Sequence, residues 1–210
     1  MSRLPPRSML PASITFGRRW WRRLVWLLAI VAVATVSVCD RSRHTPARIS
    51  DETRYHDRSF AVVRVVDGDT LIIDVPDAST AKPVTRIRLW GVDTPELAHG
   101  ATKAMHFGAD AAAFAKQTLE GRSVHIVLSP KRTRGKYGRL LAYVYLERGG
   151  RMFNEMLLEG GYAYADLRFA HHYKKRFEAA DKRARKAGVG LWAHVTLEQM
   201  PAWKQRFERR

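Results

Sequence analysis

Five short runs of β-branched and aromatic residues constrain the fold of this chain more than any other feature. Asp, Gly or Pro residues bound the runs, which cover residues 59–66, 70–75, 84–90, 123–128 and 140–146. Such runs are typical of β-strands, and the first three in direct succession indicate an antiparallel meander. Five short strands with helices between them, within about 135 residues, predict an α+β fold: a small five-stranded OB-type antiparallel β-barrel, closed to remove its edges.

The segments between and after these runs predict three helices. The first carries Phe107, Ala111, Phe114 and Thr118 at helical spacing, and Gly121 stands where a C-terminal stop belongs. A short second helix covers residues 152–159. The third carries a core-facing stripe formed by Tyr173, Phe177, Ala180, Ala184 and Ala187.

The N-terminus has the pattern of a targeting segment. A basic stretch at 18–23 precedes fifteen uncharged, mostly apolar residues at 24–38, which is typical of the n-region and h-region of a signal peptide. We therefore expect residues 1–39 to be a signal peptide or signal anchor, with cleavage near Ala34, lipidation of Cys39 or retention as the alternatives. The protein is then exported, either periplasmic or secreted in a bacterium or anchored in the inner membrane. In the last case residues 20–39 associate with the membrane.

Charge and cysteine content narrow the functional classes. The net charge is +17, of which residues 1–50 carry +8 and the remainder +9, so the folded part is itself basic and attracts polyanions. A single cysteine excludes an intramolecular disulfide framework and a multi-cysteine metal site. We divide the remaining chain into a polar linker at 40–57, the barrel domain at 58–193 and a basic C-terminal tail at 194–210.

Two acidic motifs follow strand-like runs. Asp67-Gly-Asp69 lies between the first two runs, and Asp93-Thr-Pro-Glu96 follows the third. Taken alone, the first is a hairpin-turn signal and the second a turn or helix cap. Carboxylates on two loops of one small barrel could instead share a hard cation such as Ca²⁺.

Basic and aromatic residues supply the complementary chemistry. Arg88 projects from its strand on the same side as Arg86, and a surface arginine is the alternative interpretation. Arg139 follows Lys136 and Tyr137, a basic and aromatic loop of the kind that holds a phosphate and stacks a base.

In order and spacing, these motifs closely resemble the staphylococcal nuclease (thermonuclease) family over about residues 60–192. The resemblance implies a Ca²⁺-dependent endonuclease that hydrolyses phosphodiester bonds of DNA and RNA with little sequence specificity, prefers single strands and leaves 3′-phosphates. We also expect a monomer. The alternative is a membrane-associated OB module that binds nucleic acid with weak or no catalysis.

The resemblance also implies roles for individual residues. The carboxylates of Asp69 and Asp93 and the carbonyl of Thr94 bind calcium, and Asp67 tightens the calcium loop. Three catalytic residues are implied, with the two arginines on the scissile phosphate and the glutamate as general base: Arg88, Glu96 and Arg139. The nucleotide's terminal phosphate is contacted by Lys136 and Tyr137.

The chain departs from the family pattern in two places. The loop at 131–136 is one residue longer than in the staphylococcal protein, and Gly135 stands where an aspartate is common. Leu167 aligns with the tyrosine that stacks on the nucleotide base in the family, which leaves Phe169 as an alternative platform.

Overall fold

The computed structural model describes residues 50–80, 82–98, 103–130 and 132–209, which belong to one compact unit. The strands are β1 Arg58–Asp67, β2 Thr70–Ile73, β3 Thr85–Leu89, β4 Val92–Asp93, β5 Ser123–Leu128, β6 Leu140–Tyr145 and β7 Tyr164–Ala165. The helices are α2 Asp51–Tyr55, α3 Gly108–Leu119, α4 Phe153–Glu159, α5 Lys174–Ala187, η1 Gly190–Ala193, η2 Leu197–Gln199 and α6 Ala202–Glu208. The expected targeting segment at 1–39, with its membrane-associating part at 20–39, lies outside the described residues. None of the described helices has the length and hydropathy needed to span a bilayer.

The predicted five-stranded barrel is confirmed. Its strands close in the order β1-β2-β3-β6-β5, and four of the five pairs are antiparallel. The fifth pair, β3 with β6, is parallel and so differs from the expected all-antiparallel barrel. The chain reaches β6 from β3 through α3 and β5 rather than through a hairpin, so β6 enters the sheet in the direction of β3.

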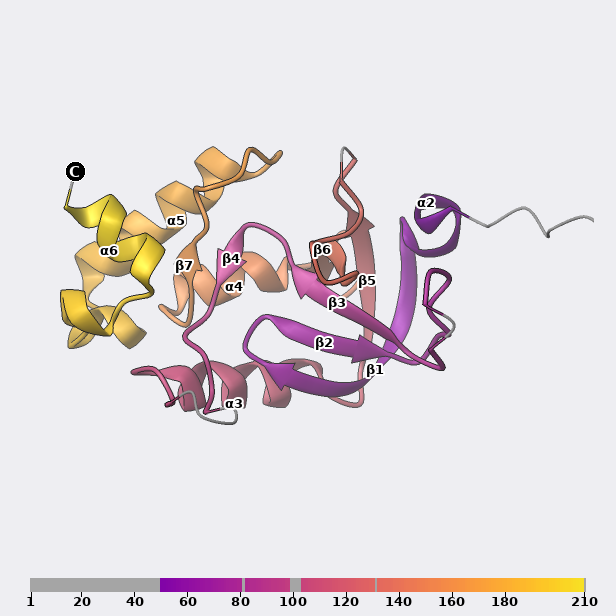
Figure 1. The fold of residues 1–210 in the computed structure, drawn as a ribbon, viewed down its shortest axis with the longest axis horizontal. Coiled ribbons are helices and arrows are strands. Elements are labelled where there is room, and N and C mark those ends of the chain that lie inside the picture. Colours follow the sequence, from indigo (N-terminus) through magenta and orange to yellow (C-terminus); the bar gives the residue numbers. More distant parts are fainter. Residues whose placement is uncertain (1–49, 81, 99–102, 131, 210) are drawn as a thin grey trace, which may run out of the picture. The chain divides into compact units, whose positions relative to one another are not determined.

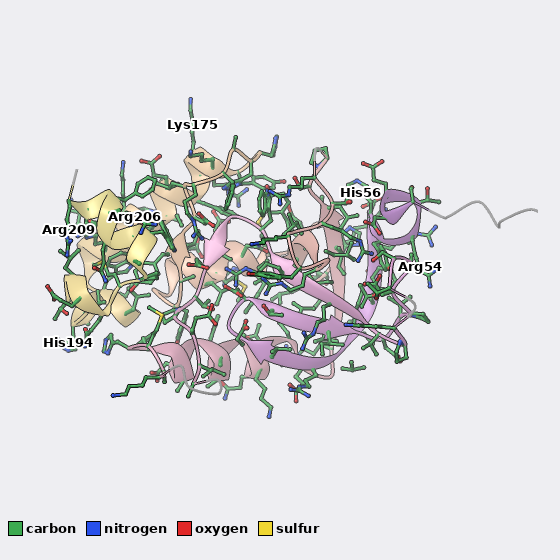
Figure 2. The ribbon with its side chains drawn as sticks, viewed as in Figure 1. Arg54, His56, Lys175, His194, Arg206 and Arg209 are labelled. Atoms are coloured by element: carbon green, nitrogen blue, oxygen red, sulfur yellow. The ribbon has the colours of Figure 1, made fainter. Side chains whose placement is uncertain are left out.

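The three predicted helices are present and cover the barrel core. Figure 1 shows α3 running alongside β1 and β2. Its buried residues are Gly108, Ala111, Ala115 and Leu119. Ala111 was predicted to be buried, and the other three each follow a predicted position by one residue. Phe114 remains half-buried and stacks on Tyr162 with ring centroids 4.2 Å apart. On α5 the predicted stripe is buried at Phe177, Ala180 and Ala184, whereas Lys175 extends into solvent (Figure 2).

A buried asparagine joins α4 to the barrel. The Asn154 side chain accepts a hydrogen bond from the Val144 amide at 2.9 Å and donates to the carbonyls of Trp90 and Ala142 at 3.0 and 3.3 Å. One side chain therefore satisfies three backbone groups where β3 and β6 end, which holds the end of the barrel that carries the acidic motifs.

The expected linker at 40–57 differs from the structure in its last part. Ser50 caps α2 by accepting a hydrogen bond from the Thr53 amide at 3.1 Å. Tyr55 is fully buried, and its hydroxyl lies 3.2 Å from the Thr85 hydroxyl. A helix of five residues is too short to show an apolar periodicity in the sequence. Its packing against the barrel depends on one buried side chain, that of Tyr55. Residues 40–49 lie outside the described part of the chain.

The expected basic tail at 194–210 is also folded in its described part. A second apolar cluster consists of Tyr164, Ala184, Leu191, Trp192, Met200 and Trp203. It lies where α5, η1 and α6 meet, and Figure 1 shows α5 and α6 together beside β7. Helix α6 is amphipathic: Trp203 is buried, whereas Arg206 is exposed (Figure 2). The tail therefore adds a helical layer next to β4 and β7.

Candidate active site

A cleft of about 480 Å³ brings together residues from both acidic motifs and the basic loop. Of the predicted site residues, those that line it are Asp67, Arg88, Asp93, Glu96, Lys136, Tyr137 and Arg139. Asp69 and Thr94 lie beneath this surface and are almost completely buried. The side chains that the sequence predicted as one site thus converge at one end of the barrel.

The Asp67-Gly-Asp69 turn is locked against the second acidic motif. The Asp67 carboxylate accepts a hydrogen bond from the Asp69 amide at 3.0 Å. The Asp69 carboxylate accepts bonds from the Thr70 hydroxyl at 3.1 Å and the Thr94 amide at 3.0 Å. A Cβ on Gly68 would lie 2.7 Å from the Thr94 side chain, so glycine is needed for this close approach. The motif is therefore more than a hairpin turn.

Arg88 bridges the two acidic motifs. Its strand register pairs it with Thr70, and its guanidinium contacts one carboxylate oxygen each of Asp69 and Asp93. Asp69 is completely buried and the Arg88 side chain is only 15% exposed. A buried carboxylate needs such a partner, so the alternative of a free surface arginine does not apply.

Burial and neighbouring charges shift the pKa values of two carboxyl groups at the cleft. Glu96 is exposed as a residue, yet burial of its carboxyl raises its pKa above the ordinary value; repulsion from Asp67 adds to the rise, while attraction by Arg88 opposes it. Burial likewise raises the pKa of Asp67, against the attraction of Arg88. A carboxylate with a raised pKa is a stronger base, which suits proton abstraction by Glu96.

The basic loop reaches the site from β6. Arg139 donates to the Thr70 hydroxyl at 3.2 Å. The Lys136 ammonium and the Arg139 guanidinium lie 5.7 and 5.8 Å from the centroid of the Tyr137 ring. Tyr137 is 77% exposed and is free to stack on a planar ligand.

Arg134 anchors this unusual loop. It donates to both oxygens of Asp51 at 2.7 Å, to Asp77 at 2.9 Å and to the Gly138 carbonyl at 2.7 Å. The amide of Gly135 closes the loop on the Arg139 carbonyl at 2.9 Å. The loop is thus held by ion pairs to α2 and to the turn after β2.

Sequence reasoning missed three residues at the site, namely Trp203, Arg168 and Asp166. Trp203 donates its indole N–H to Asp93 Oδ2 at 2.6 Å. Arg168 lies 3.8 Å from the same oxygen and donates two hydrogen bonds of 2.8 Å to the Asp166 carboxylate, which hold it in place. No local motif marked them, since a tryptophan in a basic tail and an Asp-x-Arg triplet occur in many contexts. Phe169 lies in the cleft and stacks on Trp90 at 5.5 Å, whereas Leu167 is not part of the lining.

The sequence of the chain is similar to those of known proteins. The family model described as "Staphylococcal nuclease homologue" matches residues 86–194. The thermonuclease of Staphylococcus hyicus is 31% identical over 169 residues, which cover 80% of this chain and 95% of that protein. The chain belongs to the staphylococcal nuclease family.

Two further proteins that are similar to this chain are also named as nucleases. The thermonuclease of Staphylococcus intermedius is 38% identical over 64% of this chain and 76% of its own length. A probable endonuclease of Pyrenophora tritici-repentis is 31% identical over 56% of this chain and 45% of its own length. Membership in the staphylococcal nuclease family therefore supports a hydrolase of the nuclease class.

The oxygen donors of this family member fit a hard cation. Asp69 and Asp93 each direct one oxygen at the same guanidinium, so a single positive charge can be shared by both carboxylates. Within the described ranges, no three His, Cys, Asp or Glu side chains form a metal-binding cluster. A cation here would therefore take its remaining ligands from backbone carbonyls, such as that of Thr94, and from water, as Ca²⁺ commonly does.

Proposed function

We propose that this protein is a Ca²⁺-dependent endonuclease that hydrolyses phosphodiester bonds of DNA and RNA with little sequence specificity and leaves 3′-phosphates. The observation that carries the proposal is the convergence of Asp69 and Asp93 on Arg88 in a cleft that Glu96 and Arg139 also line. This set combines paired oxygen ligands, a base and two guanidinium groups.

Each residue has a role in the proposed reaction. Asp69, Asp93 and the Thr94 carbonyl would hold the calcium ion, which would supply Lewis-acid chemistry for the phosphate. Glu96 accepts a proton from the attacking water. Arg88 and Arg139 bind the phosphate oxygens and stabilise the negative charge that develops there.

The proposed bond changes follow from these roles. The water oxygen forms a bond to phosphorus, the bond from phosphorus to the 5′-oxygen breaks, and the 5′-oxygen takes up a proton from solvent. One product keeps a 3′-phosphate and the other a 5′-hydroxyl. Asp67 helps to hold the calcium loop, since its carboxylate fixes the Asp69 amide.

A second cleft supports an extended single strand as substrate. It has a volume of about 620 Å³ and shares Tyr137 and Arg139 with the first. Lys82 and Arg86 line it and are exposed. A basic groove with an exposed aromatic ring suits a single strand of any sequence, because every base has a face that can stack. Lys136 and Tyr137 would contact the nucleotide next to the scissile bond.

The cellular setting is part of the proposal. The basic and apolar stretches at 18–38 support export to the periplasm or medium, with retention in the inner membrane as the alternative. We also propose that the protein acts as a monomer.

The test incubates the purified protein with denatured DNA, and separately with RNA, in the presence of Ca²⁺ or a chelator. We expect cleavage of both only with Ca²⁺, and product ends that carry 3′-phosphates by mass spectrometry. Glu96→Gln should slow cleavage, whereas Glu52→Gln, the same change at an exposed position on α2, should not. Binding of both nucleic acids without calcium-dependent cleavage would overturn the proposal.

A further inference from the structure

The C-terminal helix reaches a carboxylate of the active site. The Trp203 indole N–H donates to Asp93 Oδ2 at 2.6 Å, and the residue is only 7% exposed. Arg88 contacts the other oxygen, Oδ1. The two oxygens of Asp93 thus have separate partners, one from the barrel and one from α6, so the plane of the carboxylate is fixed.

The indole ring itself is held on its face. The Arg168 guanidinium lies over the Trp203 ring at 4.4 Å from the centroid, close enough for a cation–π interaction. The two hydrogen bonds that Arg168 donates to the Asp166 carboxylate keep the guanidinium in that place. Trp203 therefore has little freedom to turn its N–H away from Asp93.

The helix is anchored to the strand next to Asp93. Lys204 is buried, and its ammonium lies 3.7 Å from Asp181 Oδ2. Asp181 Oδ1 accepts a bond from the Ala165 amide at 3.0 Å, and Ala165 pairs with Val92 in the small β4–β7 sheet. The contacts from α6 through α5 and β7 thus return to β4, the strand that ends at Asp93.

We propose that Trp203 is a positioning residue for Asp93, so that α6 belongs to the catalytic unit. Its hydrogen bond holds Oδ2, so that Oδ1 is the oxygen that shares the Arg88 guanidinium with Asp69. The inference rests on the proposed function in one respect, namely that Asp93 binds calcium. Hydrogen-bond partners that orient a metal ligand typically contribute about 10–100-fold to metal affinity.

The test compares two identical substitutions in the same apolar cluster. Trp203→Phe keeps an aromatic ring but removes the N–H donor. Trp192→Phe is the matched control, because Trp192 is 9% exposed and its indole nitrogen has no hydrogen-bond partner among the described residues. Calcium affinity is measured by isothermal titration calorimetry on the full chain, without substrate.

We expect Trp203→Phe to weaken calcium binding at least about tenfold, whereas Trp192→Phe leaves it unchanged. Thermal unfolding without calcium shows whether both variants are folded. Equal calcium affinity of Trp203→Phe and the parent protein would overturn the inference. If the parent protein itself binds no calcium, the proposed function fails instead, and the two failures are distinguished by that titration.

A spectroscopic measurement covers the case in which Trp203→Phe does not fold. In a ¹H–¹⁵N spectrum the indole N–H bonded to a carboxylate should give a signal that moves when Asp93→Asn replaces the charged acceptor. The other indole signals should stay in place. A spectrum in which no indole signal responds to Asp93→Asn would overturn the hydrogen bond and with it the positioning role.

Discussion

Asp77→Asn tests how the loop that carries Lys136 and Arg139 is held. Asp77 is buried and pairs with Arg134 at 2.9 Å, and its other oxygen accepts bonds of 2.7 Å from the amide and hydroxyl of Ser79. Burial alone would raise its pKa, but the bonds from Arg134 and Ser79 outweigh burial and lower it from 3.8 to about 2. The ionised carboxylate therefore stabilises the folded state.

The size of that contribution follows from the two pKa values. A tenfold change in proton affinity corresponds to about 1.4 kcal/mol, so lowering the pKa of Asp77 from 3.8 to about 2 contributes about 2.5 kcal/mol to stability. Because the folded-state pKa is the lower one, the full contribution is present above about pH 5 and is lost as the pH falls through about 4 to 2. Asp77→Asn should therefore cost about 2 kcal/mol at pH 7 and almost nothing near pH 2.

Urea unfolding at several pH values, followed by tryptophan fluorescence, measures this difference. The control is Asp74→Asn, the same change at an exposed position just after β2, which should have a small effect at every pH. A destabilisation by Asp77→Asn that stays constant from pH 7 to pH 2 would refute the argument, since it would show that packing rather than charge determines the role of Asp77.

Three further substitutions test the site and its support. Arg88→Lys should lower the single-turnover cleavage rate at least about tenfold with folding intact, because lysine cannot bridge two carboxylates or fork onto a phosphate; an unchanged rate would remove Arg88 from the site. Asn154→Leu should lower the free energy of unfolding by about 3 kcal/mol in urea, since the Val144 amide and the Trp90 carbonyl lose the side chain that they bond to and the Ala142 carbonyl loses one of its two donors. Arg86→Ala should raise KM for long oligonucleotides with kcat unchanged and reduce the salt slope of binding by about 0.7, which cleavage at several salt concentrations measures.

The barrel and the main site residues were predictable because their signals are local. Each strand carries its own alternation and turn residues, and closure of a five-stranded barrel leaves few arrangements for them. Asp69 comes directly before β2 and Asp93 shortly after β3, so the pairing of Thr70 with Arg88 brings the two acidic motifs to the same end of the barrel. The parallel β3–β6 pair was not predictable in this way, since it depends on the path of the chain through α3 and β5.

The segments expected as a linker and a tail were misjudged for the opposite reason: their roles depend on distant partners. Tyr55 is buried only because the turn after β2 covers it, and Trp203 meets Asp93 across 110 positions of sequence. Neither contact gives a periodic pattern in the sequence, because a single side chain makes the contact instead of a stripe of apolar residues along a helix. Both contacts nevertheless bear on the loops that carry the site, since α2 holds Arg134 through Asp51 and α6 holds Asp93. The flanking segments thus help to fix the geometry of the proposed site, so substitutions of Asp51 and Trp203 should alter cleavage or calcium affinity although neither residue lines the cleft.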